Sequence, residues 1–323
     1  KAVGMIRGFG VAPYLETTAG AGTELADIRF EEDGSVTLVT GNKDFGMGHA
    51  TPFAQVLSAQ LGVPFEVIKL VQHDSDEMSL GAGGSGGSRS MIAASGAILE
   101  CAEAIVENGK KLAGHVLEAA IEDIEFAGGV FTVAGTDRNI GIMTLAEKAR
   151  ELGGEADLPE ELSHKVNHST APTSFPNGCH AAEVEIDPDT GVVTIDRYTV
   201  VDDFGVVVNP LIVEGQVHGG IAQGIGQVLA EDTIYDANGQ LMTGTFLDYQ
   251  LPRADDIAHI NFTTHEVPCK TNPLGVKGCG EAGNGGSYPV IYNAIMDALN
   301  GNGGKEIGIP ATPHRIWQAL VEH

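Results

Sequence analysis

A carboxylate inside a run of glycines is the residue best suited to chemistry in this sequence. Glu281 lies within GVKGCGEAGNGG, between Gly280 and Ala282. These small neighbours leave room beside the side chain for a bulky ligand. A carboxylate kept away from water has a raised pKa, which makes it a better proton acceptor, so it can serve as a general base. The residues alone leave open a structural alternative, in which Glu281 caps the helix that follows.

The same stretch has the spacing of a dinucleotide-binding fingerprint, but its context argues against that function. From Gly278 to Gly283 it reads GCGEAG, which matches G-x-G-x-x-G. The fingerprint requires an apolar strand directly before it and a helix that starts within it. Pro268 and Pro273 predict a loop before the motif, and we expect the helix only from about Tyr288. We therefore do not expect a nicotinamide or flavin site in this chain.

Glycine-rich loops recur at four places in the sequence, which has 44 glycines. They lie at residues 46–49, 81–90, 215–226 and 275–286, each next to a predicted helix start or strand end. Glycine lets backbone approach a ligand closely, and the N–H groups at helix N-termini bind anions. Four such loops indicate one large polar ligand that carries phosphate. The alternative is four independent tight turns.

Alternating strand and helix signals predict an α/β (α+β) fold. The expected elements are a hairpin over residues 26–41 that turns at Asp33-Gly34, a helix over 51–62, a strand over 65–74, a long helix over 90–121, a shorter helix over 143–154, and a loop or linker over 155–177.

The second half of the sequence repeats a pattern of the first. Residues 26–46 and 182–205 each show two strand segments around an Asp/Gly turn and then Asp-Phe-Gly, and each is followed by a glycine-rich loop and a helix. Such self-similarity predicts two related hairpin-plus-helix lobes, at residues 1–160 and 161–323, whose glycine loops meet at one place. Chance similarity of two ordinary hairpins is the alternative. We expect Phe45 and Phe204 of the repeated motif to lie in the core.

Composition and charge exclude several classes of protein. The formal net charge of −26 repels nucleic acid and anionic lipid, and no run of about 18 apolar residues predicts a membrane span. The four cysteines form no C-x-x-C pair, which argues against an iron–sulfur cluster or a zinc ribbon in this chain and is typical of a cytoplasmic protein. We expect surface or core roles for four histidines whose spacing fits no zinc site: His49, His73, His180 and His218.

Six segments, in family order, resemble the molybdopterin-binding large subunit of the molybdenum hydroxylases, the xanthine oxidase and aldehyde oxidoreductase family. In chain order they are GNKDFGMGHAT, HDSDEMSLGAGGSGGSRS, AAEVEIDPDTGVVTIDRYTVVDDFG, EGQVHGGIAQGIGQVLAE, GVKGCGEAG with NAIMDAL, and IPATPHRIWQAL. The resemblance covers nearly all 323 residues but only the C-terminal half of the family's subunit. It implies a fragment or one half of a split subunit, similar to the medium molybdopterin subunit of nicotinate dehydrogenase.

The resemblance implies a molybdenum-dependent oxidoreductase that hydroxylates an N-heterocycle, a purine or an aldehyde, with water as the oxygen source and Glu281 as the base. Its cofactor would be molybdopterin in the cytosine dinucleotide form, with molybdenum held by the pterin dithiolene and not by protein side chains. Electrons would pass to iron–sulfur (2Fe-2S) and FAD subunits, and the N-terminal half of the large subunit would be a further partner. The cofactor-contact positions it implies are Gly46, Met47, Gly48, His49, Thr51, Ser88, Arg89, Ser90, Gln216, Lys277, Gly278, Cys279 and Gly280.

One position departs from the family pattern. Met47 stands where the family has Gln, and a thioether cannot donate a hydrogen bond. Arg89 and Lys277 would offset the cofactor phosphates, and the hydroxyls of Ser88 and Ser90 would donate to them. The departure supports an alternative function, a non-catalytic structural domain that binds partners but no cofactor. The sequence does not distinguish purines, N-heterocycles, aldehydes and carbon monoxide as substrates.

Overall fold

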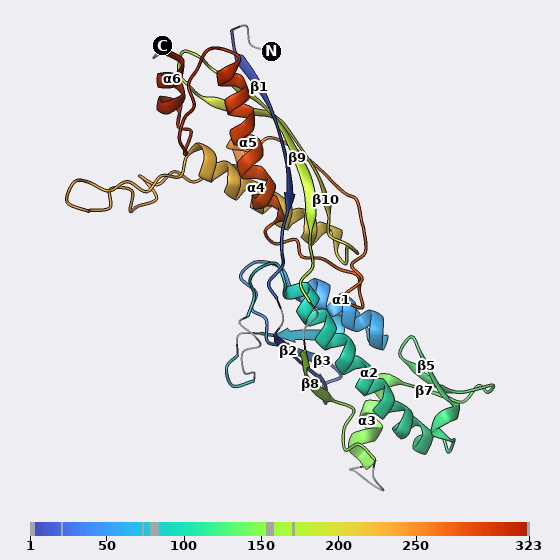
Figure 1. Ribbon diagram of the computed structural model, residues 1–323. Helices are drawn as coiled ribbons and strands as arrows, with labels where there is room; N and C mark the ends of the chain where they lie inside the picture. Colours follow the sequence, from blue (N-terminus) through green and yellow to red (C-terminus); the bar gives the residue numbers. More distant parts are fainter. Residues whose placement is uncertain are drawn as a thin grey trace. The chain divides into compact units, whose positions relative to one another are not determined.

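The computed structural model describes residues 4–20, 22–72, 74–77, 84–152, 158–169 and 172–321. These residues form two compact units, each built on a four-stranded sheet (Figure 1). Unit 1 contains the described residues up to Thr17, then Phe175–Pro268, and the described residues from Lys277 onward. Unit 2 contains Thr18–Ser174 and Cys269–Val276.

Unit 1 has a sheet in the order β1-β9-β10-β11, in which only the β10–β11 pair is parallel. Its elements are β1 (Ile6–Leu15), β9 (Asn177–Ile186), β10 (Val193–Asp203), α4 (Pro210–Leu229), a 3-10 turn (Ala254–Asp256), β11 (Ile260–Thr264), α5 (Ala282–Asn300) and α6 (Pro313–Val321). Helix α5 lies along β1 and β9, and α4 packs on α5 (Figure 1). Glycine makes the first contact possible, because a Cβ at Gly8 would lie 2.0 Å from the Ala294 carbonyl oxygen.

Unit 2 has a sheet in the order β4-β3-β2-β8, and a second sheet of three short strands. Its elements are β2 (Thr23–Phe30), β3 (Val36–Thr40), α1 (Ala50–Leu61), a 3-10 turn (Phe65–Val67), β4 (Ile68–Val71), α2 (Ser90–Val116), a second 3-10 turn (Ile121–Asp123), β5 (Ile124–Ala127), β6 (Val130–Val133), β7 (Asn139–Gly141), α3 (Ile142–Leu152) and β8 (His164–Ser169). Helix α2 covers β2 and β8, and α1 packs on α2. Five consecutive residues of β3 are buried, as expected for a strand covered on both faces.

The repeat expected from the sequence is confirmed by the topology. In unit 2 the antiparallel pair β2–β3 is followed by α1, the parallel strand β4 and helix α2. In unit 1 the antiparallel pair β9–β10 is followed by α4, the parallel strand β11 and helix α5. An antiparallel edge strand, β8 or β1, completes each sheet. That the glycine loops of the two copies meet stays a prediction.

Each edge strand comes from the other half of the sequence, so the units do not coincide with residues 1–160 and 161–323. Strand β1 pairs with β9 over ten residues and therefore belongs to the C-terminal unit. Strand β8 pairs with β2 and extends the N-terminal unit to Ser174. That both units bind molybdopterin stays a prediction.

Most expected elements are present, and the differences have local causes. The turn at Gly34 (φ +80°) and the end of α1 at Gly62 (φ +64°) are as predicted, whereas among the described residues of the expected strand over 65–74 only 68–71 form a strand. The expected loop over 155–177 was wrong because it contains β8, whose polar alternating sequence HKVNHS hides the strand. None of the helices in the described parts of the chain is both long and apolar enough to span a membrane.

Candidate functional site

In unit 2, the loop that carries the first four predicted cofactor positions is closed around a carboxylate. Asp44 accepts hydrogen bonds from the backbone N–H groups of Gly46 and Met47 (both 2.7 Å), Gly48 (3.3 Å) and His49 (2.7 Å). Burial alone would raise the pKa of Asp44, but these donors outweigh it and lower the pKa below its usual value. The N–H groups before α1 therefore already hold an anion from their own loop and are not available to a phosphate in this arrangement.

The side chains of this loop point in different directions. The Met47 sulfur accepts a hydrogen bond from the Phe45 N–H (3.4 Å), so the thioether folds back on its own loop. The His49 ring is buried and stacks on Phe53 with 4.9 Å between ring centroids, which is a core role. The expectation that Phe45 lies in the core was wrong, because 70% of its surface is exposed, whereas Phe204 is buried. Thr51 lies in the first turn of α1 and is partly buried.

A second loop in unit 2 is tied to the first through Ser85. The Ser85 hydroxyl accepts a hydrogen bond from the Lys43 N–H (3.0 Å) and donates to the Lys43 carbonyl oxygen. This loop leads to Ser88, which has a left-handed backbone (φ +55°), a conformation that costs energy in a residue with a side chain. The structure thus joins Lys43, which precedes the Gly46–His49 loop, to Ser85, which precedes the Ser88–Ser90 segment, within unit 2.

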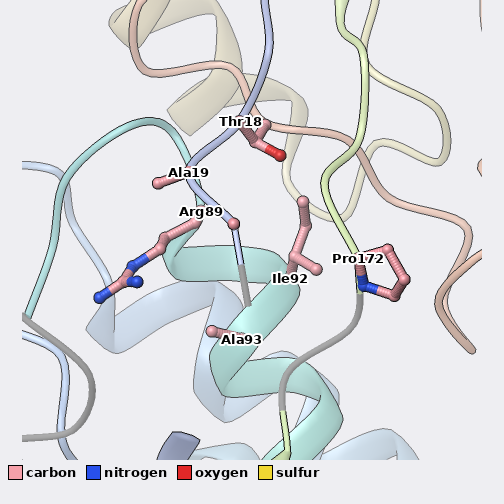
Figure 2. Close-up of a pocket in the computed structure, with 7 residues that line it drawn as sticks. Thr18, Ala19, Arg89, Ile92, Ala93 and Pro172 are labelled. Atoms are coloured by element: carbon pink, nitrogen blue, oxygen red, sulfur yellow. The ribbon is translucent and has the colours of Figure 1, made fainter. Parts of the chain in front are cut away.

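Arg89 precedes α2 and lines a small hollow together with Thr18, Ile92 and Pro172. Figure 2 shows Ile92 and Pro172 facing each other, with the Arg89 guanidinium directed away from Pro172. The guanidinium donates to the Gly84 carbonyl oxygen (3.1 Å). Its charge also acts to lower the pKa of the buried Glu24 carboxylate, but burial outweighs this and raises that pKa. The Arg89 side chain makes no capping hydrogen bond at the N-terminus of α2, and a helix terminus flanked by an arginine and two hydroxyls suits an anion.

In unit 1, a buried ion pair fixes the loop that precedes α5. The Lys277 ammonium pairs with Asp203 at the end of β10, and these side chains are only 11% and 9% exposed. The Lys277 N–H also donates to the Phe204 carbonyl oxygen (2.7 Å). Lys277 was expected to offset cofactor phosphates, but here its charge is already balanced by a carboxylate. Its observed contacts are those of a residue that positions the loop.

Asp203 gathers further donors besides Lys277. Its carboxylate accepts hydrogen bonds from the N–H groups of Gly205 (2.9 Å) and Val267 (3.0 Å). Burial alone would raise the pKa of Asp203, but the hydrogen bonds from Lys277 and from the two backbone groups outweigh it and lower the pKa. The end of β10, the segment after β11 and the loop before α5 are thus joined at one carboxylate.

Glu281 occupies the residue directly before α5, which begins at Ala282 and not near Tyr288 as expected. It does not cap the helix, because its side chain makes no capping hydrogen bond. The carboxylate is exposed, so the described residues of this chain do not supply the dry surroundings expected from the sequence. Because α5 starts inside the G-x-G-x-x-G spacing, the late-helix argument against a dinucleotide site was wrong. Residues 270–274 form bends and turns, so the motif is not directly preceded by the apolar strand that a dinucleotide site requires.

The glycines around Glu281 differ in exposure, and the cysteine between them is a neutral thiol. Gly278 is buried, Gly280 is exposed and Cys279 is partly buried. Burial raises the pKa of Cys279 to about 12, and the negative charges of Glu16 and Asp202 add to this shift. The thiol is therefore protonated near neutral pH and is not poised as a nucleophile.

Close packing of α4 on α5 places Gln216 relative to Glu281. A Cβ at Gly283 would lie 2.2 Å from the Val217 carbonyl oxygen, and a Cβ at Gly220 would lie 2.7 Å from the Asn284 nitrogen. The helices therefore cross in nearly direct backbone contact at the first turn of α5. Gln216 lies in the turn of α4 that reaches this crossing, and Glu281 directly precedes it on α5.

A buried polar cluster, which the sequence did not indicate, lies against the first turns of α5. The His180 Nδ1 lies 2.6 Å from the Tyr198 hydroxyl, and the Tyr14 hydroxyl donates to Asp202 (2.9 Å). A Cβ at Gly286 of α5 would lie 2.3 Å from the His180 ring. The cluster supports α5 from the sheet side, and it makes His180 the core histidine that was expected.

The remaining histidines do not form a metal site in the described part of the chain. His218 lies 3.9 Å from Glu214 on the same helix, and His73 lies outside the described residues. No group of three or more His, Cys, Asp or Glu side chains among the described residues could hold a metal ion.

The fold is a mixed α/β fold with glycine-rich loops before helices α1, α2 and α5, and comparisons with known proteins identify its family. A family model described as the molybdopterin cofactor-binding domain matches residues 1–258. The chain belongs to this family, and its resemblance to the molybdenum hydroxylases is confirmed. The α/β fold is confirmed by solved structures of the same kind.

The most similar relatives include several oxidoreductases. The chain is 35% identical to the nicotine 6-hydroxylase large subunit of Paenarthrobacter nicotinovorans, over 99% of this chain and 38% of that protein. It is 32% identical to the carbon monoxide dehydrogenase large chain of Hydrogenophaga pseudoflava, over 98% of this chain and 41% of that protein. The structure of quinoline 2-oxidoreductase from Pseudomonas putida 86 matches with a TM-score of 0.89 and 33% identity, over 99% of this chain and 42% of that chain. The chain thus spans about two fifths of the length of these relatives.

The described residues fit a molybdopterin in part. An added Cβ would meet nothing within 4 Å at Gly46 and Gly86 of unit 2 or at Gly215 and Gly219 of unit 1, so the backbone is open at each of these glycines. Ser88, Arg89 and Ser90 form a donor set suited to phosphate. Two expected donors, Lys277 and the N–H groups before α1, are instead bound to carboxylates of this chain.

Proposed function

We propose that this chain is the part of a molybdenum hydroxylase that binds molybdopterin cytosine dinucleotide and supplies the catalytic base, in the cytoplasm and together with other polypeptides. Its reaction would add a water-derived oxygen to a small molecule. The electrons would leave through partner subunits that carry FAD and iron–sulfur clusters. When bound, the cofactor supplies a molybdenum centre that accepts the two electrons of the oxidation.

The observation that carries this proposal is the position of Glu281. Its carboxylate stands at the start of α5, on a loop anchored by the Lys277–Asp203 pair and beside the α4–α5 crossing. A base held on a fixed helix start can accept a proton from the attacking oxygen nucleophile in a defined direction. The neutral thiol of Cys279 places no competing charge next to it. The sequence and its neighbouring loops thus support proton transfer at Glu281.

An N-heterocycle is the substrate class that the relatives favour over purines, aldehydes and carbon monoxide. Nicotine 6-hydroxylase at 35% identity and quinoline 2-oxidoreductase at 33% identity are both named for aromatic nitrogen rings. The carbon monoxide dehydrogenase large chain is nearly as similar, at 32% identity. The preference therefore rests on the relatives' names and has to be tested by a substrate screen.

A non-catalytic domain that binds partners but no cofactor is the second candidate, and two observations favour it. Met47 replaces the family's Gln, and its sulfur is turned onto its own loop. Asp44 occupies the N–H groups that would otherwise face an anion before α1. Both candidates predict a folded chain in a complex, and only the first predicts molybdenum in it.

Elemental and nucleotide analysis of the native complex tests the proposal. Near-stoichiometric molybdenum together with CMP released by acid is the expected result. An intact complex without molybdenum would establish the structural alternative. In a loaded complex, Glu281→Gln should lower kcat by about 10²–10⁴-fold, the usual contribution of a general base, while molybdenum content and the unfolding transition stay unchanged. Glu306→Gln, an exposed glutamate of the same unit, is the matched control and should have the activity of the wild type.

A further inference from the structure

A long arm leaves unit 1 after α4 and returns before the 3-10 turn at Ala254. This arm, residues 231–253, contains no helix or strand of its own, and its isolated β-bridge joins Tyr235 to Leu241. Figure 1 draws it in orange, extending away from the end of α4. A segment of this length without packed secondary structure is uncommon in a compact unit unless it is functional.

Apolar side chains are concentrated on the arm and are not buried by the described chain. Phe246 is 90% exposed and Leu247 is 94% exposed, higher values than for any other large hydrophobic residue among those described. Further exposed apolar residues of the arm are Ile234, Tyr235, Leu241, Met242 and Leu251. Single exposed apolar residues are ordinary, but seven of them within one segment of 23 residues suggest a surface for interaction.

Hydrogen bonds within the arm hold it in a defined shape. Asp236 accepts from the N–H groups of Asn238 (2.8 Å) and Gln240 (2.9 Å), which closes the turn at the tip. The Thr245 hydroxyl donates to Asp248 (2.7 Å) across the turn that contains Phe246 and Leu247. The Phe246 and Leu247 side chains are therefore presented outward from an ordered turn, and a partner would not have to order them on binding.

The base of the arm is fixed to unit 1 as well. The Tyr249 hydroxyl donates to Glu231 (2.6 Å), and a Cβ at Gly226 of α4 would lie 2.2 Å from the Glu231 carboxylate and 2.7 Å from Pro252. The end of the arm that returns to unit 1 thus lies against the last turn of α4, and this contact sets the outward direction of the arm.

Charge identifies the chemistry of the partner and argues against a second copy of this chain. The arm carries Asp236 and Asp248 beside its apolar residues, and Asp255 and Asp256 follow it directly, with Arg253 the only basic residue in this stretch. A second copy would bring another net charge of −26 to the contact and be repelled. The complementary surface is an apolar groove with lysine or arginine side chains at its rim.

We propose that the arm docks into such a groove on the remainder of the molybdopterin large subunit, with Phe246 and Leu247 as the buried anchors. The relatives supply the reason for this occupant, because the chain aligns with only 38% to 42% of their length and the rest of that subunit must contact the aligned part. The proposal rests on the proposed function in one respect, that a large subunit of the relatives' kind is present.

Photo-crosslinking in the native complex tests the occupant. p-Benzoylphenylalanine at position 246 should crosslink to a peptide from the part of the large subunit that this chain does not cover, and that peptide should combine apolar residues with flanking lysine or arginine. A crosslink to a second copy of this chain, to an iron–sulfur subunit or to a FAD subunit would overturn the proposal. A complex that gives no crosslink to protein at this position would also overturn it.

Trypsin cleavage after Arg253 in the native complex provides the second readout. Docking should protect this bond in the wild type, and Phe246→Ser with Leu247→Ser should speed its cleavage at least about tenfold, since buried anchors dominate such interfaces. Val192→Ser with Val321→Ser, two exposed apolar residues of unit 1 outside the arm, should leave the bond protected. Equal cleavage rates in wild type and arm variant would refute docking. The molybdenum content of the same samples reports on the proposed function separately. A molybdenum-loaded complex with an unprotected arm refutes only the docking. A protected arm in a complex without molybdenum refutes only the proposed cofactor.

Discussion

Removing one partner of the buried Lys277–Asp203 pair should cost at least as much stability as removing both. Lys277→Met leaves the Asp203 carboxylate with its two backbone donors but without a cation, in surroundings where the two side chains are about one tenth exposed. Asp203→Asn leaves the Lys277 ammonium without an anion. The double variant replaces the pair by a neutral amide and an apolar chain of similar volume.

The magnitudes follow from the desolvation of an unpaired charge. Breaking a buried ion pair by removing one partner typically costs about 3–5 kcal/mol, whereas replacing both partners is often close to neutral. We expect each single variant to lose about 3 kcal/mol of unfolding free energy, near the lower end of that range because neither side chain is completely buried. The double variant should lose about 1–3 kcal/mol, so the coupling energy should reach roughly 3 kcal/mol or more.

The only tryptophan of the chain makes this measurable in the correct unit. Trp317 lies in α6, which belongs to unit 1, and both members of the ion pair belong to the same unit. The fluorescence of Trp317 in urea therefore reports the unfolding of that unit. The four proteins of the double-mutant cycle give the coupling energy directly. Losses in the double variant equal to the sum of the single losses would refute the argument. They would mean that the pair is solvated and does not anchor the loop before α5.

The same pair sets a pH dependence whose sign can be worked out. The pKa of Asp203 is lowered in the folded state, so its stabilising contribution is present above the unfolded pKa of about 3.9 and is lost as the pH falls through the folded value. The difference in unfolding free energy between wild type and Asp203→Asn should therefore stay constant from pH 7 to about pH 5 and shrink only below about pH 4. A difference that disappears between pH 7 and pH 5 would contradict the lowered pKa.

Three further changes test the surroundings of Glu281 and the departure at Met47. Gly286→Ala should cost about 1–3 kcal/mol in the Trp317 assay because its Cβ would lie 2.3 Å from the buried His180 ring. Gly285→Ala, whose Cβ would lie 3.4 Å from the Tyr14 ring, should be neutral or stabilise the helix by up to about 1 kcal/mol, and equal losses would contradict the packing. Cys279 should react with iodoacetamide at pH 8 much more slowly than the exposed Cys179, and its rate should rise about tenfold per pH unit toward a pKa of about 12. Peptide mass mapping measures both rates. Rapid alkylation of Cys279 at pH 8 would disprove the burial of its thiol. Met47→Gln should leave stability within about 0.5 kcal/mol and raise kcat in a loaded complex by restoring an amide donor, and steady-state kinetics that show no gain would remove Met47 as the cause of any weak activity.

Elements with strong local signals could be predicted from the sequence. The Asp33-Gly34 turn and Gly62 mark a hairpin and a helix end because glycine there adopts a left-handed backbone, which few other residues tolerate. The repeated Asp-Phe-Gly motif predicted the duplicated topology correctly, since it follows the second hairpin strand in both copies.

Elements that depend on tertiary contacts could not be predicted. The start of α5 reads AGNGGS, a sequence of low helix propensity, and it is helical because Gly283 packs on α4 and Gly286 packs on His180 at distances that admit no side chain. For the site, the positions of the glycine loops were predictable, but the partner of Lys277 was not. An ion pair between residues 74 positions apart in the chain leaves no local signal.

The repeated motif explains why the two copies can have different tasks. Asp44 comes shortly after the second strand of its hairpin and Asp203 ends the second strand of the other, and the pKa of each carboxylate is lowered by the donors it collects. Asp44 collects N–H groups of its own loop and so stabilises that loop, and Phe45 beside it is exposed. Asp203 collects Lys277 and Val267 from distant segments, and Phe204 is buried beside them. Through this change of partners the second copy holds the loop before α5. Asp44 closes a turn in unit 2, whereas Asp203, at the corresponding position in unit 1, anchors the loop that leads to Glu281.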